Sequence, residues 1–167
     1  GFSNGHWNPY FKIIAEANTI IGRVPTSKLT DAQKKEYEAQ GRFFRAFAYR
    51  CLAYLYGGVP LILEEVKAPK IDFVRATRKE VYAQVITDLK FAAENLKAIT
   101  AVKDGQISNL VAQHYLSEVY IADGQFQNAV TAADVVINNS TVRLMTNRFG
   151  SRRTETPGDV YWDLFRA

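Results

Sequence analysis

The stretch Gly41–Ile62 reads GRFFRAFAYRCLAYLYGGVPLI and decides the fold of this chain. Apolar residues occupy nearly every position from Phe43 to Tyr56, so a helix formed there has to be covered on more than one side. The GGVP sequence that follows ends this helix sharply, because glycine terminates helices and proline cannot continue one. Upstream, Thr30 and Asp31 are both good N-cap residues. The sequence therefore predicts one long helix from near Thr30 to Tyr56.

Four more helices are predicted by the 3–4 spacing of apolar residues. A proline suits the first turn of the first one, and Gly22 follows its last periodic residue as a stop. The helix after the long one has a capping box, in which Glu80 stands three residues after its N-cap. An extended connector, Leu61–Arg75, precedes that N-cap. The four helices are Pro9–Ile21, the segment from Thr77 to Leu96, the segment from Ser108 to Tyr120, and Gln125–Asn138.

The last two predicted helices are separated only by a tight turn at Asp123-Gly124, so they must be antiparallel neighbours. Their spacing matches a tetratricopeptide repeat, with Ser117 as the small residue of the first helix, Gly124 at the turn and Ala129 in the second helix. A coincidental helical hairpin is the alternative. No strand alternation stands out except at Val59–Leu63. The predicted fold class is therefore all-α, with antiparallel helix pairs stacked as a tetratricopeptide-like superhelix.

The composition is that of a folded domain. Of the 167 residues, 47% are hydrophobic and 23% are charged, which is too apolar for a disordered chain. The net charge of +4 is spread along the chain and forms no basic stripe, so we expect no nucleic-acid partner. The single cysteine, Cys51, cannot form an intrachain disulfide and is expected to be a small buried thiol. No run approaches the roughly 18–20 apolar residues of a membrane span.

Several motifs, in order along nearly the whole chain, resemble the SusD/RagB family. In that family a long helix ends in a Tyr-Gly-Gly-Val-Pro-Leu turn, which stands here at residues 56–61. One departure is Gln40-Gly41-Arg42, where a family helix usually has Glu-Ala-Arg; the glycine weakens the helix by about 1 kcal/mol. The other matching positions are Trp7, Asn18 and Ile21 of the opening helix, and the segments Ala76–Leu89, Val111–Ile137 and Gly158–Phe165.

The resemblance implies that residues 1–167 are a single helical N-terminal domain, with an irregular loop region at about 141–160. The whole protein would be an outer-membrane surface lipoprotein of a Gram-negative bacterium. Its signal, its lipidated cysteine and a large C-terminal portion would lie outside this chain. Such proteins capture an oligosaccharide and deliver it to a SusC-like TonB-dependent transporter, with no cofactor and no catalysis. The helical part acts mainly as a scaffold. We also expect an exposed apolar surface where the absent part would dock, because the long helix is apolar nearly all round and a terminal repeat needs a cap.

Sugar binding of this kind uses aromatic faces against C–H groups and polar side chains for hydroxyl groups. The candidate ligand residues are Trp7, Asn8, Tyr161 and Trp162. Packing is the favoured role for Trp7, which can hold the first helix on its neighbour, and equally for Tyr161 and Trp162. A basic cluster could bind an acidic glycan or a partner, although a solvated loop is its default interpretation. That cluster consists of Arg148, Arg152 and Arg153.

Other chemistries have weaker support. His114 and Glu118 lie four residues apart on one helix and could both touch a metal, but no third ligand is placed. Glu64 and Glu65 are adjacent in extended chain and would point to opposite faces, unlike an acid–base pair across a cleft. No catalytic residue, metal site or cofactor is predicted. Two alternatives stay open: a tetratricopeptide-type scaffold that binds only protein, and an enzyme such as a glycoside hydrolase.

Overall fold

The computed structural model describes residues 2–103, 105–150, 154, 156 and 158–161, with side chains from Gly5 onward. Internal contacts divide the chain into two compact units, Gly1–Val136 and Ile137–Ala167. In the described residues no strand forms, and one isolated antiparallel bridge joins Pro60 to Arg75. The predicted all-α class is confirmed. The elements are α1 (Phe2–Arg23), η1 (Val24–Thr26), α2 (Asp31–Tyr56), α3 (Arg78–Asn95), η2 (Ile99–Ala101), α4 (Asn109–Ala122) and α5 (Phe126–Ile137).

The predicted start of α1 is wrong, because the helix begins at Phe2 and places Pro9 in its interior. Proline there removes the hydrogen bond to the carbonyl four residues back. Tertiary packing holds the extra turns in place: the ring of Trp7 lies 4.8 Å from that of Phe11 and 5.1 Å from that of Tyr56 in α2. The predicted stop at Gly22 is also wrong, since α1 continues through Gly22 to Arg23.

Two capping boxes fix the starts of α2 and α3, as the sequence predicts for α3. At α2, the Thr30 hydroxyl accepts the Gln33 N–H at 3.3 Å, and the Gln33 side chain accepts the Thr30 N–H at 3.0 Å. At α3, Thr77 and Glu80 make the same pair of bonds at 3.2 and 2.7 Å. These side chains satisfy N–H groups that have no partner within the helix.

The α4–α5 turn has the repeat geometry that the sequence predicts. Gly124 adopts φ +78°, a left-handed conformation that glycine takes without steric cost. Ala129 of α5 is buried in the same hydrophobic cluster as Leu116 and Val119 of α4. The Ser117 hydroxyl donates to the His114 carbonyl of its own helix at 2.7 Å.

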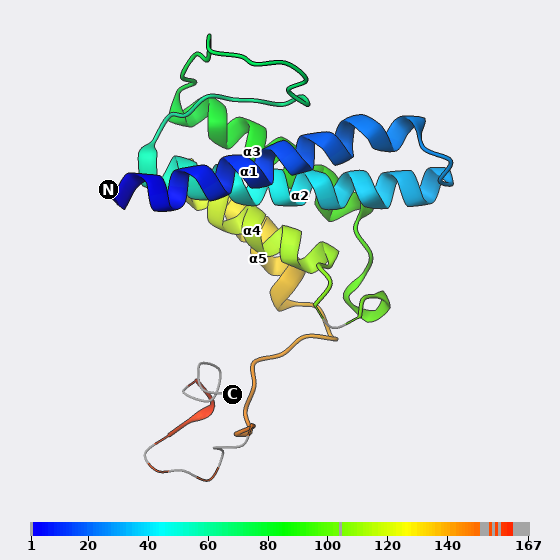
Figure 1. Ribbon diagram of the computed structural model, residues 1–167. Coiled ribbons are helices and arrows are strands. Elements are labelled where there is room, and N and C mark those ends of the chain that lie inside the picture. Colours follow the sequence, from blue (N-terminus) through cyan, green and yellow to red (C-terminus); the bar gives the residue numbers. More distant parts are fainter. Residues whose placement is uncertain (1, 104, 151–153, 155, 157, 162–167) are drawn as a thin grey trace. The chain divides into compact units, whose positions relative to one another are not determined.

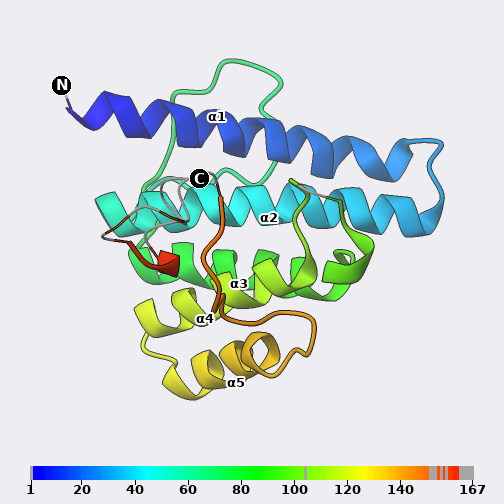
Figure 2. The same ribbon diagram turned by 90° about the horizontal axis from the view of Figure 1, so that it is seen from below.

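The helices of the first unit lie in chain order across one layered stack, in which each runs antiparallel to the one before (Figure 2). The long helix α2 is sandwiched between α1 and α3, which explains why its sequence is apolar nearly all round. The core is centred on this sandwich. Its largest fully buried apolar side chains are Tyr49, Ile14, Leu52, Leu89, Val59, Val81, Val85 and Val119.

Residues 57–77, called the connector below, join α2 to α3 outside the helical stack. The chain leaves α2, passes over the α1 and α3 side as an extended loop and returns to the same end (Figure 1). The predicted extended segment Leu61–Arg75 is confirmed within it. None of the helices in the described part of the chain is long and apolar enough to cross a membrane.

Candidate functional site

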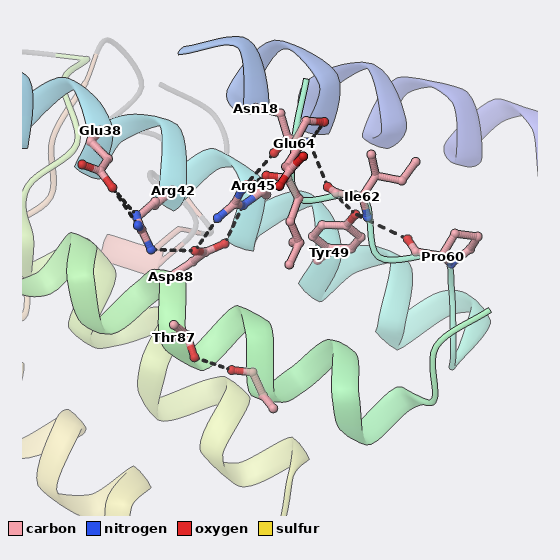
Figure 3. Close-up of polar contacts among 12 residues, drawn as sticks. Asn18, Glu38, Arg42, Arg45, Tyr49, Pro60, Ile62, Glu64, Thr87 and Asp88 are labelled. Carbon is pink, nitrogen blue, oxygen red and sulfur yellow. Dashed lines mark hydrogen bonds and ion pairs between the residues drawn. The ribbon is translucent and has the colours of Figure 1, made fainter. Parts of the chain in front are cut away.

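A buried ionic cluster lies where α1, α2, α3 and the connector meet. The guanidinium of Arg45 donates to both carboxylate oxygens of Asp88, each at 2.8 Å, and the two residues are 4% and 0% exposed. Arg42 adds a second cation at 3.5 Å from Asp88 while donating to Glu38 at 2.8 Å. Two-point pairing of this kind is the strong, directional form of the arginine–carboxylate bond. It links α2 to α3 without exposing either charge (Figure 3).

The same cluster grips the first half of the connector. Arg45 donates a further bond to the Leu63 carbonyl at 2.9 Å and one to the Asn18 side-chain oxygen at 2.9 Å. The Asn18 amide in turn donates to the carbonyls of Ile62 and Glu64 at 2.8 and 3.2 Å (Figure 3). Because buried polar groups are costly when unpaired, these bonds define one position for the connector backbone.

Tyr49 of α2 also holds the first half of the connector. Its hydroxyl accepts the Ile62 N–H at 2.6 Å and donates to the Ile62 carbonyl at 3.1 Å. Burial raises the pKa of the Tyr49 phenol to about 12, although the Ile62 N–H and nearby Arg45 act in the opposite direction. The phenol is therefore a neutral donor throughout the physiological range.

The second half of the connector is tied back to the end of α2. Arg75 donates to the Gly58 carbonyl at 2.6 Å and to the Tyr56 carbonyl at 2.9 Å, and the Ala76 N–H donates to the Val59 carbonyl at 3.1 Å. Gly58 leaves no room for a side chain, because a Cβ there would collide with the Ala76 carbonyl. The connector is thus closed at its base by bonds from both of its halves.

An apolar groove of about 550 Å³ lies on the first unit, walled by α1, α2, α3 and α4. Tyr54 is 77% exposed there, and Arg50 forms an ion pair with Glu118 on the rim. Cys51 lines this groove half-buried, so the prediction of a buried thiol is wrong. The hydrogen bond between Cys51 and Tyr10 is the main cause that raises the pKa of Tyr10. Leu55 and Ile121 are further exposed apolar side chains that line this groove.

The predicted ligand residues are divided between the two units, with Trp7 and Asn8 in the first and Tyr161 in the second. Trp7 is half-buried in its stack with Phe11 and Tyr56, which is the packing role favoured from the sequence. Asn8 is exposed on α1, and Tyr161 is exposed in the second unit. Trp162 lies outside the described residues.

The charged residues that the sequence singled out as possible metal, catalytic or basic sites have other partners or lie partly outside the described residues. His114 lies 3.5 Å from Glu118, whose carboxylate is also engaged by Arg50. Across the described part of the chain, no three His, Cys, Asp or Glu side chains gather as a metal site. Glu65 pairs with Arg23, which lowers the pKa of the Glu65 carboxyl. Of the basic cluster, Arg148 is described, whereas Arg152 and Arg153 lie outside the described residues.

Sequence reasoning missed the buried cluster. Arg45 stands inside the apolar run of α2, and Asp88 stands next to Leu89 on the apolar face of α3. A charged residue at a core position is the signal that could have identified them, since such residues are almost never fully buried unless paired. The sequence identifies Asn18 as a position that matches the SusD/RagB opening helix, but it assigns no role to this residue.

Comparisons with known proteins agree with this architecture. Residues 2–121 match the SusD-like family described as "Starch-binding associating with outer membrane". SusD-like protein P2 of Formosa agariphila is 35% identical over 141 residues, which are 83% of this chain and 28% of that protein. The chain thus spans less than a third of the length of that relative.

Two solved structures share the fold at moderate sequence identity. A crystal structure with xylogluco-oligosaccharide is 28% identical, with a TM-score of 0.76, and the match covers 86% of this chain and 31% of that one. A SusD-like carbohydrate-binding protein of Bacteroides vulgatus is 25% identical, also with a TM-score of 0.76, over 84% of this chain and 32% of that one. Because the family match covers well over half of the sequence and these structures share its helical stack, the chain belongs to the SusD-like family.

Proposed function

We propose that this chain is the helical part of a nutrient-binding protein that captures a glycan at the outer-membrane surface. The observation that carries the proposal is the family match over residues 2–121, joined to the likeness to a structure with bound xylogluco-oligosaccharide. The whole protein is a surface lipoprotein that delivers its ligand to a SusC-like TonB-dependent transporter. Its task is binding and release, with no covalent chemistry.

Within that protein, this part acts mainly as a scaffold. Its strongest polar interactions, those of Arg45 and Asp88, are buried and internal, so they orient helices and the connector without reaching a ligand. The carboxylates of Glu65 and Glu118 are engaged by arginines, which supports a binding role over acid–base catalysis. Asn8, Tyr161 and Trp162 remain proposed ligand contacts, and Trp7 is proposed to set the position of the helix that carries Asn8.

A second candidate function is a scaffold that binds only protein. The apolar groove beside Tyr54 favours it, because large exposed apolar patches usually mark interaction surfaces. Experiments can distinguish glycan binding from protein binding, since the two are proposed to use different surfaces.

The test is a glycan-array comparison of this chain with the longer protein that we propose to contain it. Two variants are measured: the single variant Asn8→Ala and the double variant Tyr161→Ala with Trp162→Ala. The control is Lys35→Ala, which alters an exposed side chain on α2. Binding by this chain that the Tyr161, Trp162 variant loses places part of the ligand site here. Binding by the longer protein alone assigns the scaffold role to this part. If neither protein binds any glycan, the proposal fails and the protein-only scaffold is preferred.

A further inference from the structure

The connector is long for a link between neighbouring helices in a repeat. The α4–α5 link needs little more than Asp123 and Gly124, whereas residues 57–77 leave the stack and return (Figure 1). Long loops within compact domains are uncommon and are usually functional when they are ordered. The connector is a closed surface loop, because the Ala76 N–H near its end donates to the Val59 carbonyl near its start.

Its order comes from both ends. The backbone from Ile62 to Glu64 is held by hydrogen bonds from Arg45, Asn18 and Tyr49. The second half of the connector is held to the end of α2 by Arg75. The Arg23–Glu65 ion pair adds a link to the end of α1. A loop held at its base loses less conformational entropy when its tip binds a partner.

The tip, residues 66–74, presents aliphatic side chains to solvent. Ile71 is 99% exposed, Val74 is 82% exposed and Val66 is also exposed. Fixing these side chains outside the core leaves their hydrophobic surface available for association. A sugar is a poor match for this surface, because the single aromatic ring of the tip, Phe73, already carries the Lys70 ammonium at 5.7 Å from its centre.

The charged side chains of the tip favour a protein partner over a lipid surface. Lys67 and Lys70 are exposed cations, and Asp72 is the one exposed anion among residues 66–74. Asp72 stands directly between Ile71 and Phe73, so inserting these residues into lipid hydrocarbon would carry a carboxylate with them, which is costly. A protein surface can pair that carboxylate while receiving the aliphatic side chains.

We propose that residues 66–74 are a protein-docking loop, whose partner surface is apolar at its centre and lined with carboxylates at its edge. For the identity of the partner this rests on the proposed function, which supplies the TonB-dependent transporter. The aliphatic side chains provide the buried centre of the contact. The two lysines steer the approach and fix its orientation.

The experiment measures binding of the longer protein to its purified transporter in detergent. Ile71→Ser with Val74→Ser removes the apolar contact, and Lys67→Glu with Lys70→Glu reverses the charges. Lys35→Glu with Lys79→Glu is the matched control, because both lysines are exposed and the net charge changes equally. Each tip variant is expected to raise Kd at least tenfold, with an unchanged thermal unfolding midpoint, while the control binds as the unaltered protein does.

Equal binding by the tip variants and the control, with the unaltered protein bound, overturns the docking loop and leaves the proposed function standing. Failure of the unaltered protein to bind the transporter overturns both. The same variants are tested on vesicles that contain anionic lipid. Vesicle binding that the tip variants lose, with transporter binding intact, overturns the protein partner in favour of a lipid surface.

Discussion

The guanidinium of Arg45 and the carboxylate of Asp88 face each other in parallel, with two nitrogen–oxygen distances of 2.8 Å, and both groups are shielded from solvent. They come from different helices, and the same guanidinium also holds the Leu63 carbonyl of the connector. One arginine thus links α2 to α3 and holds the first half of the connector.

Removing one partner of the buried pair is expected to be severe. Asp88→Ala leaves the Arg45 guanidinium buried without a counter-charge, which costs about 3–5 kcal/mol in the free energy of unfolding. Glu38→Ala, which removes a half-buried partner of Arg42, is expected to cost less than about 1 kcal/mol. Urea unfolding measures both. Similar costs for the two variants would contradict a structural role of the buried pair.

Tyr49 predicts a loss of stability at high pH. Its pKa is about 12 in the folded chain, and a solvent-exposed phenol titrates near ~10. Because the folded pKa is raised, the contribution is fully present below about pH 10 and is lost as pH rises toward 12. Tyr49→Phe is expected to be less stable at pH 8 by about 1–3 kcal/mol, since the Ile62 N–H loses its acceptor. The difference should shrink between pH 10 and 12, and urea unfolding curves that fall in parallel would refute this.

Gly58 predicts a steric requirement at the base of the connector. Gly58→Ala places a Cβ against the Ala76 carbonyl and is expected to cost about 1–3 kcal/mol, as overpacking does. Gly22→Ala is the control, because a Cβ there meets open space within α1. It is expected to stabilise the chain by about 0.5–1 kcal/mol. Denaturant unfolding of the two variants should therefore give changes of opposite sign.

Trp7 is predicted to act through packing. Trp7→Ala removes the ring that lies against Phe11 and Tyr56, and we expect a loss of about 2–3 kcal/mol in the free energy of unfolding. Asn8→Ala, at the next and exposed position, should leave stability within about 0.5 kcal/mol of the unaltered chain. Thermal unfolding checks both. An unchanged unfolding midpoint for Trp7→Ala would contradict the packing role and favour ligand binding as the role of Trp7.

The apolar groove predicts binding of a hydrophobic dye to the 167-residue chain. Tyr54 and Ile121 are exposed on it, so Tyr54→Ser with Ile121→Ser should lower the dye fluorescence. Tyr37→Ser, which alters an exposed ring outside the groove, is the comparison. A chain that stays monomeric at high concentration and gives no dye signal would show that this surface does not need a partner.

Local sequence was sufficient for helices α1 to α5 and for most of their ends, but not for the ends of α1. The caps at Thr30 and Thr77, the glycine turn at Gly124 and the apolar run of α2 each depend on residues within a few positions of one another. Such signals act through backbone hydrogen bonds and short-range periodicity, which a sequence displays directly. The resemblance to the SusD/RagB family rested on the same stretches, and the family match confirms it.

Tertiary structure decided what the sequence could not show. Pro9 lies in the interior of α1, where the nearby Trp7 packs on Tyr56, which is distant in sequence. Arg45 meets Asp88 and the connector only after α2 and α3 are assembled. The physical reason is that a buried charge and a loop base are stable only when partners from far along the chain arrive together. The sequence by itself determined which segments are helical, and the packing of α1, α2 and α3 determined how the connector is held.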